Sequence, residues 1–505
     1  MTKIALTLLL LISNLLMATT ASSNEEPDKQ PIPEAKVATT QHEIKLGAKT
    51  INYTATAGTM LMKNKKGQPV ALMGYTAYTV NGKNTANRPL MFAYNGGPGS
   101  ASIWLHMGIL GPQRAVASDA GFSPNGPFRH VENQYSIIDE VDLVMIDPVG
   151  TGFSKPVGKG KGEDFWGVDQ DIKSVSEFIV QYVTDNGRWA SPKFILGESY
   201  GGMRSGGVAW RLLTEHNLGL NGVVLVSPFM EMTTGFAGLG IDLPHVMFLP
   251  TFAATAWYHD ALDNKPENLE AFMEEVEEFS MQEYAPALLM GKRLSGQQRQ
   301  DVIQKLARYT GLSESYWDRA DLRISEGQFT KELLRGRDET VGRIDSRFKG
   351  DSINLLGEQA FYDPMGSAIG PPFLAAFMDY YRSDLEVTTD EEYVVSGKLW
   401  MHWDWGHAQP DMGGFKVPFP NTLVDLSLTM KQNPNMKVLY QQGYYDLATP
   451  HLATRYYIDH MDITPELRNN VSLKMYEAGH MMYIHEPSMV KYKQDLADFI
   501  RASYR

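Results

Sequence analysis

The chain has 505 residues, of which 43% are hydrophobic and 21% are charged, and its formal net charge is -13 at pH 7. This composition is typical of a globular protein with a sizeable core, and it argues against wholesale disorder or several membrane spans. The acidic balance repels nucleic acids and anionic lipids, so neither is expected as a partner. The chain has no cysteine, which excludes disulfides, thiolate catalysis and cysteine-bound zinc.

The N-terminal residues have the order of a secretory signal. A lone Lys3 precedes an apolar run from Ile4 to Met17, and small residues follow. We interpret residues 1–21 as a signal peptide and expect no stable membrane insertion after its removal; an uncleaved anchor is the alternative. Residues 22–40 are polar and aperiodic, which predicts a flexible lead-in with order beginning near Gln41. Together with the absence of cysteine, this predicts an exported protein, periplasmic or secreted, of bacterial type.

Residues 41–235 have the pattern of the first part of an α/β core. Alternating stretches between residues 42 and 80 predict antiparallel hairpins. Short apolar runs bounded by glycine or proline then alternate with helical segments, which predicts a mostly parallel sheet with helices on both faces. These runs are Leu90–Tyr94, Leu143–Ile146, Phe194–Leu196 and Val223–Val226.

Residues 236–420 lose this rhythm and carry charged helical patterns, for example at 266–279 and 297–309. We interpret them as an inserted, mainly helical cap. Residues 421–505 return to the core, with strand-like runs at Lys437–Tyr440 and Val471–Tyr476, each followed by a glycine-containing loop. A final helix is expected after Pro487, because Leu496, Phe499 and Ile500 share one helical face.

A glycine-rich turn surrounds one serine. The expected strand Phe194–Leu196 leads into Gly197-Glu198-Ser199-Tyr200-Gly201-Gly202. Glycines on both sides of Ser199 permit the sharp strand-to-helix turn of a nucleophile elbow, and an ordinary glycine-rich turn is the alternative. Since a serine hydroxyl needs a base to take its proton, the motif predicts a histidine and a carboxylate later in the chain.

The loops after the last two expected strands supply both groups. Asp446 follows Lys437–Tyr440, and His480 follows Val471–Tyr476. Ligands of parallel α/β sheets bind at the carboxyl ends of the strands, so these loops are expected to meet at the elbow. The order Ser199, Asp446, His480 is that of α/β hydrolases, with His480 as the base and Asp446 orienting its ring. A turn-capping aspartate and a packing histidine are the alternatives.

A tetrahedral intermediate also needs backbone N–H donors for its oxyanion. The N–H of Tyr200, directly after the nucleophile, is one candidate. The loop Asn95–Ser100 follows the strand Leu90–Tyr94 and contains three glycines, and Gly97 is the second candidate. A tight turn or a phosphate-binding loop is the alternative, although the loop lacks the Gly-Lys-Ser/Thr ending of a phosphate loop.

With these motifs in order, the chain resembles the serine carboxypeptidase family of α/β hydrolases. The matching segments are Asn95–Ser100, Asp147–Ser154, Gly197–Gly201, Gly443–Asp446 and Gly479-His480. The resemblance implies release of single C-terminal residues from peptides. It assigns the nucleophile, acid and base to Ser199, Asp446 and His480, and the oxyanion donors to Gly97 and Tyr200. It also implies that Asn95 and Glu198 hold the terminal carboxylate of the substrate.

Glu198 can attract a carboxylate only when it is protonated and donates a hydrogen bond. Peptidase efficiency on free C-termini is therefore expected to fall as pH rises and Glu198 ionises, while an amide-blocked C-terminus is affected less. The alternative is a glutamate that pairs with the dipole at a helix N-terminus.

The sequence departs from the family at several points. Ile109 stands where relatives commonly carry a second glutamate, Ala93 stands where they often carry tryptophan, and the usual cysteines are absent. Ile109 puts the paired-carboxyl recognition of the substrate terminus in question.

Three other segments have weaker signals. Residues 402–407 contain His and Asp at metal-compatible spacing, but an aromatic cap patch is the preferred interpretation, and no metal is predicted. Residues 147–154 are expected to be a structural turn beside the site. The side chains of Met247, Phe248, Phe252, Trp257 and Tyr258 are expected either to line a side-chain pocket or to pack inside the cap.

The sequence thus predicts an exported serine carboxypeptidase that acts on peptides through an acyl-enzyme and needs no cofactor. An esterase or acyltransferase on the same scaffold, or a non-catalytic binding protein, is the alternative, because the fold does not fix the acyl acceptor.

Overall fold

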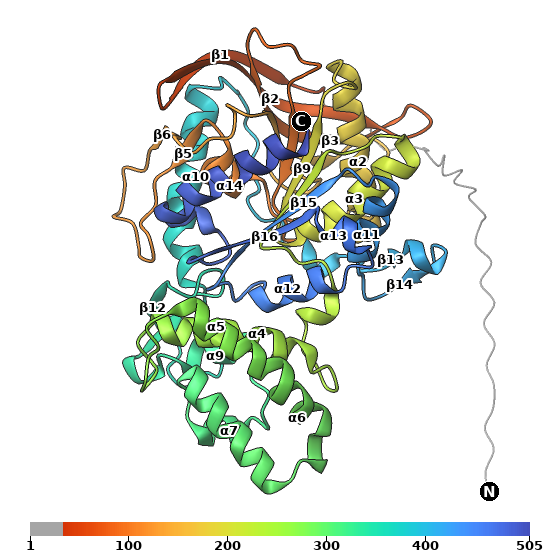
Figure 1. Cartoon of the computed structure of the whole chain (residues 1–505). Coiled ribbons are helices and arrows are strands. Elements are labelled where there is room, and N and C mark those ends of the chain that lie inside the picture. Colours follow the sequence, from red (N-terminus) through yellow and green to blue (C-terminus); the bar gives the residue numbers. More distant parts are fainter. Residues whose placement is uncertain (1–33, 505) are drawn as a thin grey trace, which may run out of the picture. The chain divides into compact units, whose positions relative to one another are not determined.

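A ten-stranded sheet organises the part of the chain that the computed structural model describes, residues 34–504 (Figure 1). The expected signal peptide and the first residues of the lead-in lie outside these residues. Along the sheet the strand order is β1-β2-β3-β7-β4-β9-β10-β15-β16, and the short strand β8 (Lys155–Pro156) pairs with β3.

The first three strands form an antiparallel meander, as the alternating residues 42–80 predict. These strands are β1 (Val37–Leu46), β2 (Lys49–Lys63) and β3 (Pro69–Val80). The expected start of order near Gln41 is too late, because β1 begins at Val37, which pairs with Gly58. Because β1 is an edge strand whose alternate residues stay exposed, its sequence is polar and does not indicate a strand.

The remaining six strands of the path run parallel to one another, and all six predicted apolar runs fall in them. Every residue of β4, β7, β9 and β10 is buried, which explains why these strands are apolar without alternation. The six are β7 (Asp142–Ile146), β4 (Leu90–Tyr94), β9 (Lys193–Glu198), β10 (Gly222–Val226), β15 (Lys437–Gly443) and β16 (Val471–Tyr476).

Helices cover both faces of the sheet, so the chain has the α/β-hydrolase architecture that the sequence predicts. Alternate residues of β4 divide between two cores: Phe92 packs on one face and Met91 on the other. The first face is covered by α2 (Val168–Asp185), α3 (Tyr200–His216) and α11 (Leu423–Gln432), and the second by α14 (Glu486–Ser503) and α10 (Pro364–Ser383). The predicted last helix is α14, in which Leu496, Phe499 and Ile500 are buried.

The insertion begins with a helical lobe, drawn at the bottom of Figure 1. Its long helix α4 (Leu243–Tyr258) packs against α5, α7 and α12, and Phe252 stacks on Phe329 with ring centroids 4.1 Å apart. The two charged patterns of the sequence are the helices α5 and α7. The lobe contains α5 (Leu269–Phe279), α6 (Ala285–Met290), α7 (Gly296–Thr310), α8 (Glu314–Arg319) and α9 (Glu326–Glu332).

The second half of the insertion differs from the prediction of one cap over residues 236–420. Helix α10 packs its Phe373 and Phe377 into the core on the second face of the sheet. Residues 394–404 then return to the loops of the core, where Val394 bridges Gly152 and Ser396 bridges Ser100. Helical periodicity shows that α10 is amphipathic but does not reveal which layer receives its apolar face.

Short elements connect these layers. They are α1 (Ile103–Leu105), a π-helical turn (His106–Leu110), β5 (Gln113–Ala115), β6 (His130–Glu132), β11 (Glu339–Val341), β12 (Lys349–Asp351), β13 (His407–Ala408), β14 (Lys416–Val417), α12 (His451–Asp459) and α13 (Pro465–Arg468). Within residues 34–504, every helix falls short of the length and apolarity that a membrane span requires.

Candidate active site

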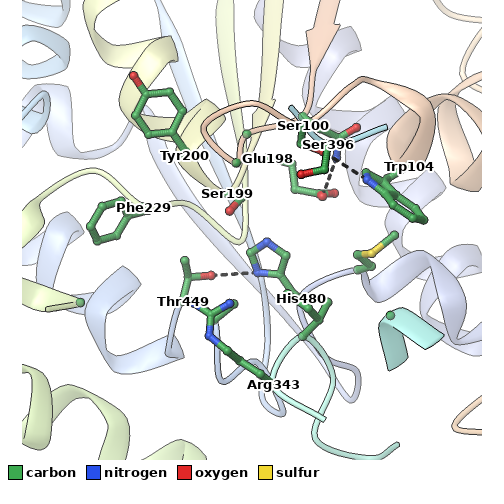
Figure 2. A pocket seen from close by; sticks show the side chains of 18 of the residues that line it. Ser100, Trp104, Glu198, Ser199, Tyr200, Phe229, Arg343, Ser396, Thr449 and His480 are labelled. Carbon is green, nitrogen blue, oxygen red and sulfur yellow. Dashed lines mark hydrogen bonds between the residues drawn. The ribbon is translucent and has the colours of Figure 1, made fainter. Parts of the chain in front are cut away.

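A cavity of about 440 Å³ lies at the carboxyl ends of the parallel strands (Figure 2). Its wall contains most of the predicted site residues, namely Asn95, Gly97, Glu198, Ser199, Tyr200 and His480. Asp446, the remaining one, is fully buried directly behind His480. The sheet therefore brings together segments that are up to 385 residues apart, from Asn95 to His480.

Ser199 occupies a strained turn between β9 and α3. Its φ is 62° and its ψ is -128°, a conformation that non-glycine residues rarely adopt. Backbone hydrogen bonds hold it there: Ser199 N–H donates to the Val226 carbonyl at 2.9 Å, and the Ser199 carbonyl accepts from Gly202 at 2.8 Å. A side chain at Gly197 would collide with the Gly201 carbonyl, so the turn requires glycine at that position. This is the geometry of a nucleophile elbow.

His480 and Asp446 form the imidazole–carboxylate pair that the sequence predicts. His480 Nδ1 lies 2.8 Å from Asp446 Oδ2. The other carboxylate oxygen accepts backbone N–H bonds from Ala448 and Thr449, both at 2.8 Å. Because the buried carboxylate accepts a bond from Nδ1, that nitrogen carries the proton and Nε2 keeps its lone pair.

The Nε2 side of the ring faces Ser199, as Figure 2 shows. Among the described residues, the Ser199 hydroxyl has no hydrogen-bond partner, so the bond between nucleophile and base is not formed in this state. Such bonds are often long without substrate and tighten in the Michaelis complex.

The pKa of His480 lies above its ordinary value although the ring is buried. Burial, the largest single effect, lowers this pKa, but the Asp446 carboxylate at hydrogen-bond distance and Glu198 together raise it more. The positive charge of Arg343 opposes them. The surroundings of His480 thus favour its protonated form.

Thr449 is a member of this network that the sequence analysis missed. Its hydroxyl lies 2.7 Å from Asp446 Oδ2, 2.9 Å from the Ser227 carbonyl and 3.1 Å from His480 Nδ1. It follows Asp446 by three residues, the spacing of a side-chain-capped turn, which is the signal that could have indicated it.

Gly97 and Tyr200, the two predicted backbone donors, both line the cavity. Within residues 34–504, neither the Gly97 nor the Tyr200 N–H donates a hydrogen bond to the protein. The loop that carries Gly97 packs directly on the elbow, because a Cβ atom at Gly96 would meet the backbone nitrogen of Tyr200 at 2.5 Å. The two segments that carry these N–H groups are therefore in direct contact beside Ser199.

A buried arginine fixes this loop from behind, and the sequence analysis did not identify it. Arg204 of α3 is fully buried and donates from its guanidinium to the Asn95 carbonyl and to Asp171 Oδ2, both at 2.7 Å. Arg204 therefore links the loop Asn95–Ser100 to α2 and α3.

Asn95 and Glu198 lie beside the nucleophile and are bonded to each other. Asn95 Nδ2 donates to Glu198 Oε1 at 2.6 Å, and Asn95 Oδ1 accepts from Leu105 N–H at 3.1 Å, which fixes the orientation of the amide. Burial raises the pKa of Glu198 to about 7, even though His480 and two hydrogen-bond donors act to lower it. This carboxyl group is therefore available in its protonated form near neutral pH.

The second oxygen of Glu198 accepts a hydrogen bond from Tyr483, which the sequence analysis also missed. The phenol oxygen lies 2.7 Å from Oε2. Ile109 is buried and lies outside the cavity wall, so no second carboxyl group contacts Glu198 from that position. The motif around His480 gives no local signal for Tyr483, since its role depends on the packing of two separate loops.

The cavity has two apolar ends. In its wall, one apolar group consists of Trp104, Met365, Ile369 and Met481, which pack with one core, and another consists of Phe229, Phe248 and Trp405, which pack with the other core. The ring of Phe236 contacts those of Phe229 and Trp405. In Figure 2, Trp104 lies on the side of Glu198 and Phe229 on the opposite side of Ser199. Of the five Met and aromatic residues proposed for a pocket, only Phe248 lines this cavity; Met247 and Phe252 pack in the core. Arg343 lies at the rim below His480, and among the described residues it forms no ion pair.

The other motifs have structural roles. His407 is buried between two carboxylates, with Nδ1 2.7 Å from Asp169 and Nε2 3.0 Å from Asp425. In the described part of the chain, no group of three or more His, Cys, Asp or Glu side chains could hold a metal ion. Asp147 accepts hydrogen bonds from the backbone and hydroxyl of Ser102, each at 2.8 Å, which makes residues 147–154 a structural turn.

Comparisons with known proteins show what the chain is similar to. The family model described as serine carboxypeptidase matches residues 63–305, slightly less than half of the chain. The match includes Asn95, Gly97, Glu198, Ser199 and Tyr200, and it ends before Asp446 and His480. A serine carboxypeptidase-like protein, number 45 of Arabidopsis thaliana, is 27% identical over 203 residues, which span 38% of this chain and 40% of that protein.

Two of the solved structures that match align with most of the chain. One is Kex1(delta)p, a prohormone-processing carboxypeptidase from Saccharomyces cerevisiae, with 14% identity, a TM-score of 0.48, and coverage of 94% of this chain and 92% of that one. The other is proline iminopeptidase of Mycobacterium smegmatis, with 14% identity, a TM-score of 0.36, and coverage of 92% and 99%.

Proposed function

We propose that this chain is a serine-type carboxypeptidase, which hydrolyses the last peptide bond of a substrate with a free C-terminus. The observation that carries the proposal is the pair of Asn95 and Glu198 in the wall of the cavity that contains Ser199. A protonated Glu198 and the Asn95 amide both donate hydrogen bonds, and a terminal carboxylate one residue beyond the scissile bond is the group that fits such donors.

The chemistry follows from the arrangement of the triad. Ser199 Oγ attacks the last peptide carbonyl while His480 Nε2 takes its proton, and Asp446 stabilises the imidazolium. The N–H groups of Gly97 and Tyr200 stabilise the oxyanion. The C–N bond then breaks, His480 gives its proton to the leaving amine, and the acyl group remains on Ser199. Water repeats the steps in reverse: His480 takes its proton, and Ser199 leaves with a proton from His480.

The two apolar ends of the cavity suit the two sides of the scissile bond. The leaving residue must lie on the side of Glu198, beside Trp104, Met365 and Ile369, so an apolar or aromatic side chain fits there. The residue that forms the acyl-enzyme lies on the opposite side, against Phe229, Phe236 and Phe248.

The test compares two peptides that differ only at the C-terminus, one a free acid and the other an amide. We expect kcat/KM for the acid to exceed that for the amide by about 100-fold or more at pH 6, because only the acid pairs with Asn95 and Glu198. Equal values would contradict a carboxypeptidase and favour an esterase or acyltransferase.

A second measurement separates a serine hydrolase from a non-catalytic homologue. A fluorophosphonate probe should label the wild-type protein, and Ser199→Ala should abolish the labelling. Ser205→Ala is a matched control, because Ser205 is a buried serine of α3 that does not line the cavity. Absence of labelling in the wild type would favour a binding protein.

For the localisation we propose export to the periplasm or the outside of a bacterial cell. The charged, apolar and small-residue order of residues 1–21 and the absence of cysteine support it. N-terminal sequencing of the protein recovered outside the cytoplasm should give a mature end near residue 22; an intact Met1 in that fraction would contradict the proposed signal.

A further inference from the structure

Tyr483 lies behind Glu198, on the short helical turn Met482–Ile484 that follows His480. The side chain is 2% exposed and does not line the catalytic cavity, yet its hydroxyl donates to Glu198 Oε2 at 2.7 Å. Its ring packs directly on Gly108 of the π-helical turn His106–Leu110, because a Cβ atom at Gly108 would meet ring carbons of Tyr483 at 2.4 Å. The phenol therefore has one fixed position against the carboxyl group.

The two oxygens of Glu198 have different neighbours. Oε1 is bonded to Asn95, which lines the cavity, and Oε2 is bonded to Tyr483, which does not. Burial keeps the pKa of Tyr483 far above 10, so the phenol stays neutral and keeps a proton to donate. Both oxygens therefore accept a hydrogen bond from a neutral donor. Among the described residues, the phenol is the one hydrogen-bond partner of Oε2, so while the phenol donates, a proton on Oε2 would have no acceptor, whereas a proton on Oε1 can be donated to a ligand in the cavity.

We propose that Tyr483 is a positioning residue of the carboxylate subsite, which sets the acidic proton of Glu198 on Oε1, next to Asn95 and facing the terminal carboxylate of the peptide. The inference rests on the proposed carboxypeptidase function and concerns how the same site tells a free C-terminus from a blocked one. Tyr483 acts through Glu198 and does not touch the substrate.

Several titratable groups surround Glu198 and enter its pH dependence. His480 and the hydrogen bonds from Tyr483 and Asn95 favour the ionised form, while burial and Asp446 favour the protonated form. Removing the phenol hydroxyl therefore raises the pKa of Glu198. Tyr492 also faces Glu198, but within residues 34–504 its buried hydroxyl has no hydrogen-bond partner, which makes it a matched control.

The experiment measures Tyr483→Phe on a free-acid peptide and on an N-blocked p-nitrophenyl ester that lacks a free carboxylate. We expect kcat/KM for the peptide to fall about tenfold, mainly through KM, because the proton is no longer held on Oε1. Ester hydrolysis, which needs the triad but not the subsite, should fall much less. The alkaline limb of the peptide profile should move to higher pH, because Glu198 keeps its proton longer.

Tyr492→Phe should leave both the KM for the peptide and the position of the alkaline limb unchanged. The proposal would be overturned if Tyr483→Phe lowered kcat/KM equally for the peptide and the ester, or if the alkaline limb of the peptide profile stayed in place. Either result would leave Tyr483 with a structural role only. A wild-type protein that cleaves the ester but not the peptide would instead reject the carboxypeptidase function itself.

Discussion

At Glu198, burial and hydrogen bonding act in opposite directions on one carboxyl group. Burial is the larger effect, and the resulting pKa of about 7 lies in the range where the group changes charge. His480 faces the same cavity, and its pKa is also raised. The proposed peptidase activity needs Glu198 protonated and His480 neutral, so the titrations of these two interacting groups together set its pH dependence.

The need for a neutral His480 and a protonated Glu198 predicts a bell-shaped pH profile of kcat/KM for free-acid peptides. The profile rises as His480 loses its proton and falls, by about tenfold per pH unit well above pH 7, as Glu198 loses its own. Hydrolysis of an ester without a free carboxylate should keep the rising limb and lose the falling one. Stopped assays between pH 4 and 9 measure both, and parallel profiles would reject the role of Glu198.

Arg343 provides a test of the rising limb. Its positive charge lowers the pKa of His480, so Arg343→Gln should raise that pKa and move the acidic limb of ester hydrolysis to higher pH. Arg293→Gln is the control, since Arg293 is exposed on the helical lobe and does not line the cavity. A limb that stays in place or moves to lower pH would contradict this account of the His480 electrostatics.

At the scale of single residues, the sequence predicts candidate site residues that lie in or next to a motif, but not residues that contact them from distant segments. Ser199, Asp446 and His480 follow predicted strands, so one rule about strand ends was enough to select them. Tyr483 and Arg204 act on residues 285 and 109 positions away, at Glu198 and Asn95. Their roles depend on how separate layers pack together, and no periodicity or motif spacing in the sequence indicates that packing.

At the scale of elements, the segment 402–417 shows how an ion pair can hold a cavity wall in place. Its Trp403 and Trp405 pack edge-on against the Tyr200 ring, with centroids 5.5 and 6.0 Å away. His407 anchors the segment between Asp169 of α2 and Asp425 of α11. The sequence showed a His and Asp spacing here, but the true partners are 238 and 18 residues away, beyond the reach of a local motif.

The anchor predicts a loss of stability at alkaline pH. Although burial lowers the pKa of His407, its two carboxylates raise it to about 9, above the value in the unfolded chain. The stabilisation is therefore complete below about pH 6.5 and disappears as pH rises through 9. We expect His407→Asn to lose about 2 kcal/mol of unfolding free energy at pH 7 and to lack the alkaline decline of the wild type.

Denaturant unfolding at pH 6.5, 8 and 9.5 measures this difference. The control is His402→Asn, because His402 belongs to the same segment but is exposed. If His407→Asn and the wild type lost stability equally between pH 6.5 and 9.5, the charged form of His407 would not be the anchor.

At the scale of the whole described chain, the sheet brings together the loops of the candidate site, and the insertion contributes residues such as Phe248, Arg343 and Met365 to the cavity wall. The apolar runs predicted from sequence coincide with the parallel strands because strands buried on both faces must be apolar throughout. The insertion was less predictable. Its helices follow from periodicity, but the division between a lobe and the core helix α10 depends on which apolar faces meet.

The lobe should affect substrate choice through Phe248, which lies in α4 and lines the cavity. Phe248→Ala enlarges the acyl side, so kcat/KM should shift several-fold toward peptides with a bulkier penultimate residue. Phe252→Ala, one turn further along α4, should instead destabilise the protein by about 3–5 kcal/mol without that shift, because Phe252 is buried against Phe329. A peptide library with varied penultimate residues and thermal unfolding separate the two outcomes.

The most direct test of the proposed carboxypeptidase is a mass-spectrometric time course on a peptide of about ten residues with free ends. The account predicts a ladder of products that become shorter by one residue at a time from the C-terminus, with no internal or N-terminal cleavage. Ser199→Ala should slow the ladder by about four to six orders of magnitude. Internal fragments, trimming from the N-terminus, or a ladder that persists in Ser199→Ala would contradict the account.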